Sequence, residues 1–231
     1  MEGFTALPLD TTSIMFSTIN SIMQVTEILK NYGSPFKNPI GEHIGTDHWR
    51  GDVRELGLNW VVKTRTMRWP NTKNWKSDWI AGLRLLESYL GDFIPNASFV
   101  EGLDREGKPN LLLVQRRVEG KLLRDCSLDE LTKNPITVAQ LHDFAQAVTQ
   151  MYKDTSRMPD IHGSPHFKRQ YQTKFTDSIM VEPSGRIRLV DVDMLGPLWH
   201  PNPFGKVHMF LHRRGLTRLV KKLGTNGRRE K

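Results

Sequence analysis

The chain has 231 residues, of which 38% are hydrophobic and 25% are charged, a composition typical of a folded globular protein rather than a disordered chain. No uninterrupted apolar run approaches the ~18 residues that a membrane-spanning helix needs. The single cysteine, Cys126, excludes an intramolecular disulfide framework and a cysteine-rich zinc site. Because the first residues also do not have the pattern of a secretory signal, we expect a cytoplasmic protein.

The formal net charge of +8 is not spread evenly over the chain. Residues 206–231 contain nine Lys or Arg residues and a single acid, Glu230, so this segment accounts for the whole excess. Residues 1–205 hold 24 basic and 24 acidic residues and are formally neutral. The basicity is therefore a property of the C-terminal segment, and it is no evidence that the body of the protein binds nucleic acid.

The first part of the chain predicts helices and strands in alternation. The elements expected there are a helix or a poorly ordered leader over residues 12–29, a loop or short strands over residues 36–54, a strand over residues 58–66 and a helix over residues 77–90. In the last of these, apolar residues recur at intervals of three and four, and Ser77 or Asp78 can cap the helix.

The second part of the chain predicts two hairpins separated by a helix. The expected elements are strands over residues 97–101 and 111–118, a helix that begins at Thr137, and strands over residues 178–181 and 187–190. The sequence Thr137-Val-Ala-Gln is a capping-box pattern. The polar stretches 104–108 and 182–186 are suitable hairpin connections. An α+β fold in two lobes follows from this order of elements.

The hairpin at residues 178–190 is followed by two acids, Asp191 and Asp193. A carboxylate at the exit of a strand can reach a Mg²⁺ ion held between phosphates. The segment resembles the metal-binding hairpin of the protein-kinase-like and aminoglycoside-phosphotransferase-like fold. The resemblance implies that Asp191 binds Mg²⁺ and that Ser178 stands where the family has a metal-binding Asn. Asp193 is the alternative metal ligand.

Two upstream segments agree with this resemblance. The run Trp60-Val-Val-Lys63 is similar to the V-A-I-K strand, so the resemblance implies that Lys63 contacts the α- and β-phosphates of ATP. On the helix that follows, Glu87 lies at the edge of the apolar stripe. It is the implied ion-pair partner that would orient Lys63.

Residues 111–120 look like the strand and hinge that join the two lobes of that fold. There the adenine of ATP would meet backbone groups near Gln115 to Val118. Residues 44–53 occupy the position of the phosphate-covering loop, in which Gly45 is one residue out of register.

The catalytic base has two candidates. The sequence Pro159-Asp160-Ile-His-Gly follows the second helix and resembles a P-D-L-x-G variant of the family's catalytic loop, so Asp160 is the first candidate. This assignment requires an insertion of about a dozen residues before Ser178. Asp177, directly before Ser178, is the second candidate for the base and could also supply a metal ligand.

The resemblance implies a small antiparallel-sheet N-lobe and a mainly helical C-lobe. The expected divisions are an N-terminal helical extension over 1–35, an N-lobe over 36–118, a C-lobe over 119–205 and a basic helix or tail over 206–231. Among known groups, compact bacterial lipopolysaccharide-core kinases and YrbL-type proteins are nearest in size.

The implied function is an ATP- and Mg²⁺-dependent phosphotransferase that acts on a hydroxyl acceptor of unknown identity. The alternative is a catalytically impaired pseudokinase that serves as a regulatory or binding module, which the Ser178 substitution favours. A third hypothesis is a basic adaptor without a nucleotide site.

The basic segment 206–231 contains Phe210, Leu216 and Leu219 at spacings that can form an amphipathic helix. Such a helix could pack on the larger lobe with its basic face in solvent. It could also bind an anionic membrane surface, which would make the protein membrane-peripheral, or a nucleic acid.

Overall fold

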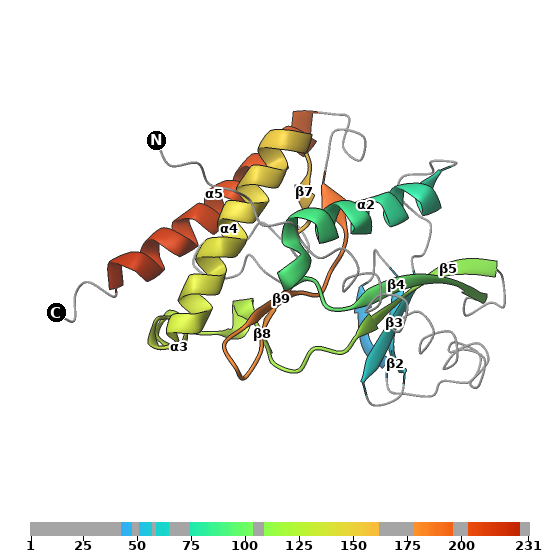
Figure 1. Ribbon diagram of the computed structural model, residues 1–231, viewed down its shortest axis with the longest axis horizontal. Coiled ribbons are helices and arrows are strands. Elements are labelled where there is room, and N and C mark those ends of the chain that lie inside the picture. The colour runs from blue at the N-terminus through green and yellow to red at the C-terminus, as the bar shows by residue number, and fades with distance from the viewer. Residues whose placement is uncertain are drawn as a thin grey trace, which may run out of the picture. The chain divides into compact units, whose positions relative to one another are not determined.

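The computed structural model describes residues 43–47, 51–56, 59–64, 74–103, 109–161, 178–195 and 203–226. These residues divide into two compact units (Figure 1): the first takes those within 1–67 and 96–117, and the second those within 68–95 and 118–231. The architecture is a mixed α and β one, with antiparallel sheets and a helical part. The helix predicted over residues 12–29 lies outside the described residues, as does Asp177.

The first unit is built on a five-stranded antiparallel sheet with the strand order β1-β2-β3-β5-β4. Its strands are β1 (His43–Asp47), β2 (Gly51–Leu56), β3 (Trp60–Thr64), β4 (Ala97–Leu103) and β5 (Pro109–Arg116). The hairpin predicted from residues 97–118 is the β4–β5 pair, in which Phe99 lies opposite Leu113. β3 is the central strand of the sheet.

Alternation along the strands places one cluster of buried apolar residues on one face of the sheet in the first unit. Leu56, Val62, Leu112 and Val114 are fully buried there, with Trp60 and Val100 packed against them. Val62 lies directly opposite Val114 in the β3–β5 ladder, and residues paired in this way point to the same face. Their neighbours along each strand therefore point to the other face.

The second unit combines helices with two small antiparallel sheets. Its elements are α2 (Trp75–Leu90), η1 (Gly91–Phe93), β6 (Lys121–Leu122), η2 (Leu123–Asp125), α3 (Leu128–Lys133), α4 (Pro135–Thr155), β7 (Met158–Pro159), β8 (Ile179–Val181), β9 (Ile187–Leu189), β10 (Met194–Leu195) and α5 (Pro203–Asn226). The strands form the sheets β6-β8-β9 and β10-β7.

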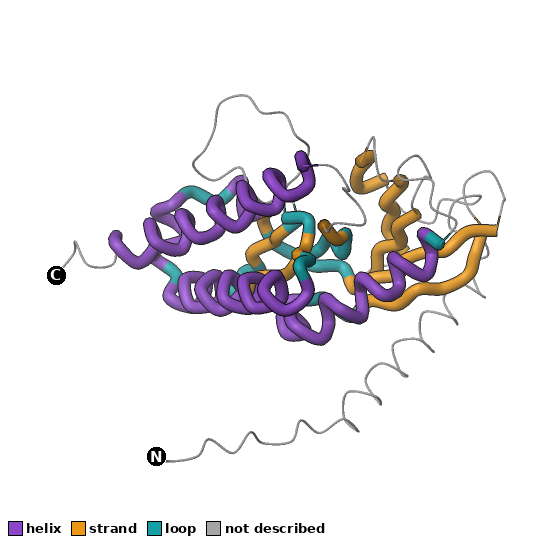
Figure 2. The backbone as a smooth tube through the Cα atoms, turned by 90° about the horizontal axis from the view of Figure 1, so that it is seen from above, coloured by secondary structure: helices purple, strands orange, loops and turns teal. Residues whose placement is uncertain are grey.

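The 21-residue helix α4 is the centre of the second unit, where α2, α3 and α5 all pack against it (Figure 2). Its buried residues Leu141, Phe144, Val148 and Met151 recur at intervals of three and four, as an amphipathic helix requires. The ring of Phe144 meets the ring of Phe93 edge to face at 5.2 Å. No helix in the described part of the chain is long and apolar enough to cross a bilayer.

Both predicted helix starts differ from the observed ones. α2 begins at Trp75 with Asn74 at the N-cap, and Ser77 lies inside the first turn, where its hydroxyl donates to the Asn74 carbonyl. α4 begins at Pro135, and its N-cap is Asn134, whose Oδ1 accepts from the N–H groups of Ile136 and Thr137. The predicted capping box at Thr137 is therefore wrong. Asn134 as the N-cap and Pro135 at the first helical position form a more favourable start for α4 than Thr137 would.

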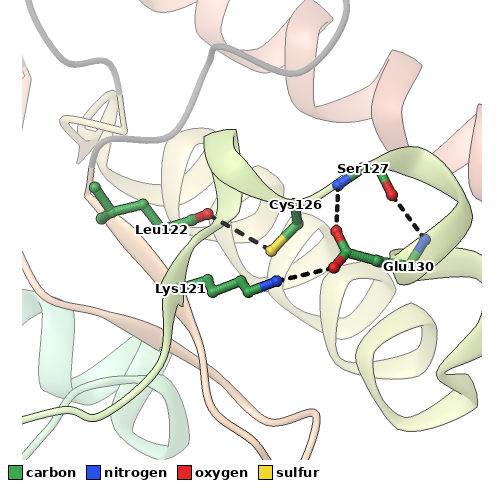
Figure 3. A network of polar contacts seen from close by, with 5 residues as sticks. All are labelled: Lys121, Leu122, Cys126, Ser127 and Glu130. Carbon is green, nitrogen blue, oxygen red and sulfur yellow. Dashed lines mark hydrogen bonds and ion pairs between the residues drawn. The ribbon is translucent and has the colours of Figure 1, made fainter.

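A capping box does occur at α3, where the sequence analysis did not place one. The Ser127 hydroxyl accepts from the Glu130 N–H at 3.1 Å, and the Glu130 carboxylate accepts from the Ser127 N–H at 2.8 Å (Figure 3). Lys121 donates to the same carboxylate at 2.9 Å, which ties the start of β6 to α3. These contacts hold the pKa of Glu130 at about 2, and the Ser127 N–H contributes most.

We predict that Glu130→Gln destabilises the fold only where the carboxylate is charged. A carboxyl group whose folded pKa is lowered stabilises the fold above its unfolded pKa, near 4.5, and this contribution is lost as the pH falls to about 2. Thermal unfolding should therefore show a lower Tm for the variant at pH 7 and similar values near pH 2. Asp129→Asn, in the same helical turn but outside this network, is the control. Equal Tm values at pH 7 would contradict the prediction.

The β8–β9 turn contains a glycine that the fold requires. Gly185 has φ of 85°, and a Cβ at this position would lie 2.5–2.8 Å from the side-chain atoms of Asn134. We expect Gly185→Ala to lower the free energy of unfolding by about 1–3 kcal/mol, because it adds backbone strain and displaces the α4 cap. Gly91→Ala is the matched control, since a Cβ there meets nothing within 4 Å. Urea unfolding of the two variants measures the difference, and equal losses would contradict it.

Candidate functional site

The predicted hairpin over residues 178–190 is present, and it delivers Asp191 at the end of its second strand. Ile179 pairs with Leu189 and Val181 with Ile187. The Val190 N–H donates to the Ser178 carbonyl at 2.7 Å, which extends the ladder by one residue beyond the strands. The side chains of Ile179 and Leu189 are fully buried, so the hairpin is anchored in the interior and its end is fixed.

A second antiparallel pair brings Asp160 to the acids that follow the hairpin. In the ladder of β7 and β10, Met194 lies opposite Pro159 and Leu195 opposite Met158. The Asp160 N–H donates to the Asp193 carbonyl at 2.8 Å and so continues the ladder. Asp160 therefore lies directly beside the segment 191–193, although 33 positions separate it from Asp193 in the sequence.

The three acids differ in their surroundings. Asp160 and Asp193 are 5% and 8% exposed, whereas Asp191 is partly exposed. The Oδ1 atom of Asp191 accepts from the Asp193 N–H at 3.2 Å, which holds its carboxylate close to the backbone of the segment. Val192, which stands between Asp191 and Asp193 in the sequence, has a buried side chain that anchors this segment in the interior of the second unit.

Helix α2 also contacts this acidic segment. A Cβ at Gly82 would lie 3.1 Å from Cγ of Met194, so the absence of a side chain lets the helix backbone approach β10 closely. Gly82 was not predicted from the sequence to be a packing position, although a glycine within the apolar stripe of a helix is a signal of close packing. The β7–β10 pair was not predicted either, since two-residue strands carry no periodic pattern.

In the first unit, Lys63 and Gln115 share one face of the central strands. Val61 pairs with Gln115 and Lys63 with Leu113, so these side chains point to the face opposite Val62 and Val114, where Leu113 is also fully buried. Gln115 is 1% exposed, and its Nε2 atom has no hydrogen-bond partner in the described structure. A buried amide donor without a partner is costly, so a ligand with an acceptor atom would stabilise it.

The predicted ion pair of Lys63 with Glu87 joins residues of different units and stays a prediction. Glu87 lies on α2, and partial burial raises the pKa of its carboxyl, an effect that Arg84 one turn away lowers in part. Gly45 lies in β1 opposite Val53, beside an irregularity in the β1–β2 register.

The remaining predicted residues have different environments. Val118 follows β5 and belongs to the second unit, whereas Gln115 belongs to the first. Ser178 is 2% exposed. Within the described ranges, no group of three or more His, Cys, Asp and Glu side chains could hold a metal ion by itself.

No protein-family model matches the chain, and no curated protein is significantly similar to it. Among solved structures, the chain is similar to the LegK7 effector kinase of Legionella pneumophila, with 11% sequence identity and a TM-score of 0.37. The match covers 78% of this chain, and the chain spans 37% of the length of that kinase.

Proposed function

We propose that the protein is an ATP- and Mg²⁺-dependent phosphotransferase with a protein-kinase-like fold that acts on a hydroxyl acceptor. The observation that carries the proposal is the hydrogen bond from the Asp160 N–H to the Asp193 carbonyl, which joins the predicted base to the predicted metal ligands. A protein kinase needs this combination, because one acid accepts the proton of the substrate hydroxyl while another holds Mg²⁺.

Asp191 and Asp193 are suited to bind Mg²⁺, which does not need a site made of protein ligands alone. Mg²⁺ is usually bound by one or two carboxylates together with phosphates and water, so a group of three acids is not required. Asp191, which is partly exposed and held by the Asp193 N–H, is the assigned ligand, with Asp193 as the second. Ser178 is almost fully buried and is therefore the weaker candidate.

Two of the residues assigned to ATP, Lys63 and Gln115, share the face of the sheet opposite Val62 and Val114. Lys63, in the central strand β3, would bind the α- and β-phosphates, and Glu87 would orient it. The adenine would meet the backbone between Gln115 and Val118, where an acceptor atom of the base could also satisfy the buried Gln115 Nε2. Gly45, in β1, would let the backbone approach the phosphates. The buried Gln115 Nε2 atom, which has no partner in the described structure, is the feature by which the site fits a nucleotide.

When bound, Mg²⁺ and ATP would supply the phosphoryl group and neutralise charge on the phosphates. The chain's own residues would supply positioning and a proton acceptor, since phosphoryl transfer requires little covalent chemistry from the protein. The backbone pairing of β7 with β10 would hold Asp160 at the site, where its carboxylate would accept the proton of the acceptor hydroxyl.

The first test addresses the metal. Asp191→Asn should abolish the Mg²⁺-dependent part of ATP binding, because a neutral amide is a poorer Mg²⁺ ligand than a carboxylate. In the parent protein, ATP and Mg²⁺ at about 100 times Kd should stabilise the fold by about 2.7 kcal/mol, seen as a rise in Tm. Asp143→Asn, an exposed acid on α4, is the control. Equal Mg²⁺-dependent shifts in the parent and Asp191→Asn would refute the role of Asp191.

The second candidate function is a binding module of the pseudokinase type. It is favoured by the burial of Ser178 at the position where the family has a metal-binding Asn. Such a protein would bind the nucleotide without transferring phosphate.

Asp160→Asn separates the two functions. In an enzyme, this variant should keep its affinity for ATP and lose roughly 10²- to 10⁴-fold in turnover, the usual contribution of a positioned base. The measurement is phosphate transfer or ATP hydrolysis across a range of hydroxyl acceptors, with Asp177→Asn assayed in parallel. If the parent binds ATP but its turnover does not exceed that of either variant, the binding module is the better assignment.

A further inference from the structure

Helix α5 carries an unusual distribution of charge. Between Pro203 and Asn226 it contains no Asp or Glu, while Lys or Arg occurs at the six positions 206, 213, 214, 218, 221 and 222. Residues 1–205 are formally neutral, so the positive potential of the protein arises mainly from this helix and the residues after it.

The apolar side of α5 is already used for packing. Met209, Leu216 and Leu223 are buried, and α5 packs against α4 and α3 of the same unit. Arg213 is held as well, since its guanidinium lies 4.2 Å from the ring centroid of Tyr152 on α4. The helix is therefore anchored on one side, and its other side is presented to solvent.

The exposed side forms one basic face, defined here by Phe210, Arg214, Arg218, Lys221 and Lys222, all of which are exposed. At about 100° per residue these five positions fall within an arc of about 120°. At about 1.5 Å per residue they extend over about 18 Å of the helix. The four cations therefore lie on one side of the helix and can contact the same partner surface.

Phe210 distinguishes this face from an ordinary solvated one. Its side chain is 57% exposed, and among the described residues only Ile136 is another large hydrophobic side chain of comparable exposure. An exposed aromatic ring beside several cations on a helix is typical of binding to the interface of a membrane, where the ring enters the acyl boundary and the cations contact anionic headgroups.

We propose that the basic face of α5 binds the surface of membranes that contain anionic phospholipids. Phe210 inserts at the interface, and Arg214, Arg218 and Lys221 contact the headgroups. The helix lies along the surface and does not span the bilayer, because its apolar side stays packed on α4. This inference does not depend on the proposed nucleotide site.

Lipid fits this face better than nucleic acid. Single-stranded nucleic acid is usually bound by several aromatic side chains on which successive bases stack, and the basic face offers one ring. The groove between α4 and α5, with a volume of about 710 Å³, is lined by both Asp143 and Lys153, so it does not extend the basic face into a channel for a polyanion. A membrane requires only one flat face.

The test is co-sedimentation of the whole chain with phosphatidylcholine vesicles that contain about one third phosphatidylserine. We expect binding that weakens as the salt concentration rises and that is much weaker on pure phosphatidylcholine. The triple variant Arg214→Ala, Arg218→Ala and Lys221→Ala should lose about 100-fold in affinity, because each cation near an anionic surface contributes about fivefold. The matched control removes three exposed cations elsewhere in the unit, Arg84, Lys133 and Arg186, and should bind nearly as the parent does.

A second pair of variants tests the aromatic ring at constant charge. Phe210→Ala should weaken vesicle binding about tenfold, whereas Ile136→Ala should not change it. Circular dichroism melts confirm that each variant is folded, as expected for substitutions of exposed residues.

Three results would overturn the proposal. The triple variant could bind the vesicles as well as its control does, or the parent could bind both kinds of vesicle equally. A single-stranded or duplex oligonucleotide could also bind more tightly than the anionic vesicles in a manner that depends on the same cations, and the basic face would then be assigned to nucleic acid.

Discussion

The pairing of β7 with β10 is the constraint on which the acidic site depends. Two-residue strands are too short to be stable by their hydrogen bonds alone. The pair persists because side chains in and beside it are buried: Met158 in β7, Ile161 two residues after β7 and Val192 two residues before β10 are almost inaccessible to solvent. Burial of side chains of this size contributes about 1.5–3 kcal/mol each. Apolar packing thus fixes the position of a polar site.

The same segment is held from two further directions. The missing side chain of Gly82 allows α2 to approach Met194, and the β8–β9 hairpin leads directly into Asp191. The hairpin is in turn held by α4, because the Thr137 hydroxyl donates to the Gly185 carbonyl at 2.8 Å. A change in α4 would therefore reach the acids through the turn of the hairpin, without any direct contact with them.

Several polar side chains of the second unit stabilise helix starts and the β8–β9 turn. Glu130 and Asn134 satisfy the N–H groups at helix starts, where a side-chain acceptor is worth about 1 kcal/mol. Arg188 joins the two ends of the hairpin turn through Glu182 at 2.9 Å and also donates to the Asp92 carbonyl. Asp160, Asp191 and Asp193 lie instead in and beside the β7–β10 pair, where the Asp191 carboxylate accepts from the Asp193 N–H.

The identity of most elements could be predicted from the sequence because it depends on local pattern. Apolar residues at intervals of three and four predicted α2 and α4, and strand-forming runs on either side of turn residues predicted the β4–β5 and β8–β9 hairpins. Hairpin pairing is also local, so the position of Asp191 two residues after β9 could be predicted directly. The exact helix starts could not be predicted in this way. Thr137 could serve either as a helix cap or in a tertiary contact, and in the structure it makes the tertiary contact while Asn134 caps the helix that begins at Pro135.

Only the tertiary structure decided which acids lie together. Resemblance to a known family indicated Asp160 and Asp191 as candidate site residues. The sequence does not show how close two residues so far apart along the chain lie in space, and two-residue strands have no periodic pattern that would predict their pairing. The separation is set by long-range burial around β7 and β10 and by the close approach of α2 at Gly82. Likewise, the sequence determined that the basic charge lies near the C-terminus, whereas packing against α4 decided which of its side chains face solvent. Composition is a property of the chain, but the orientation of a helical face depends on what the helix packs against.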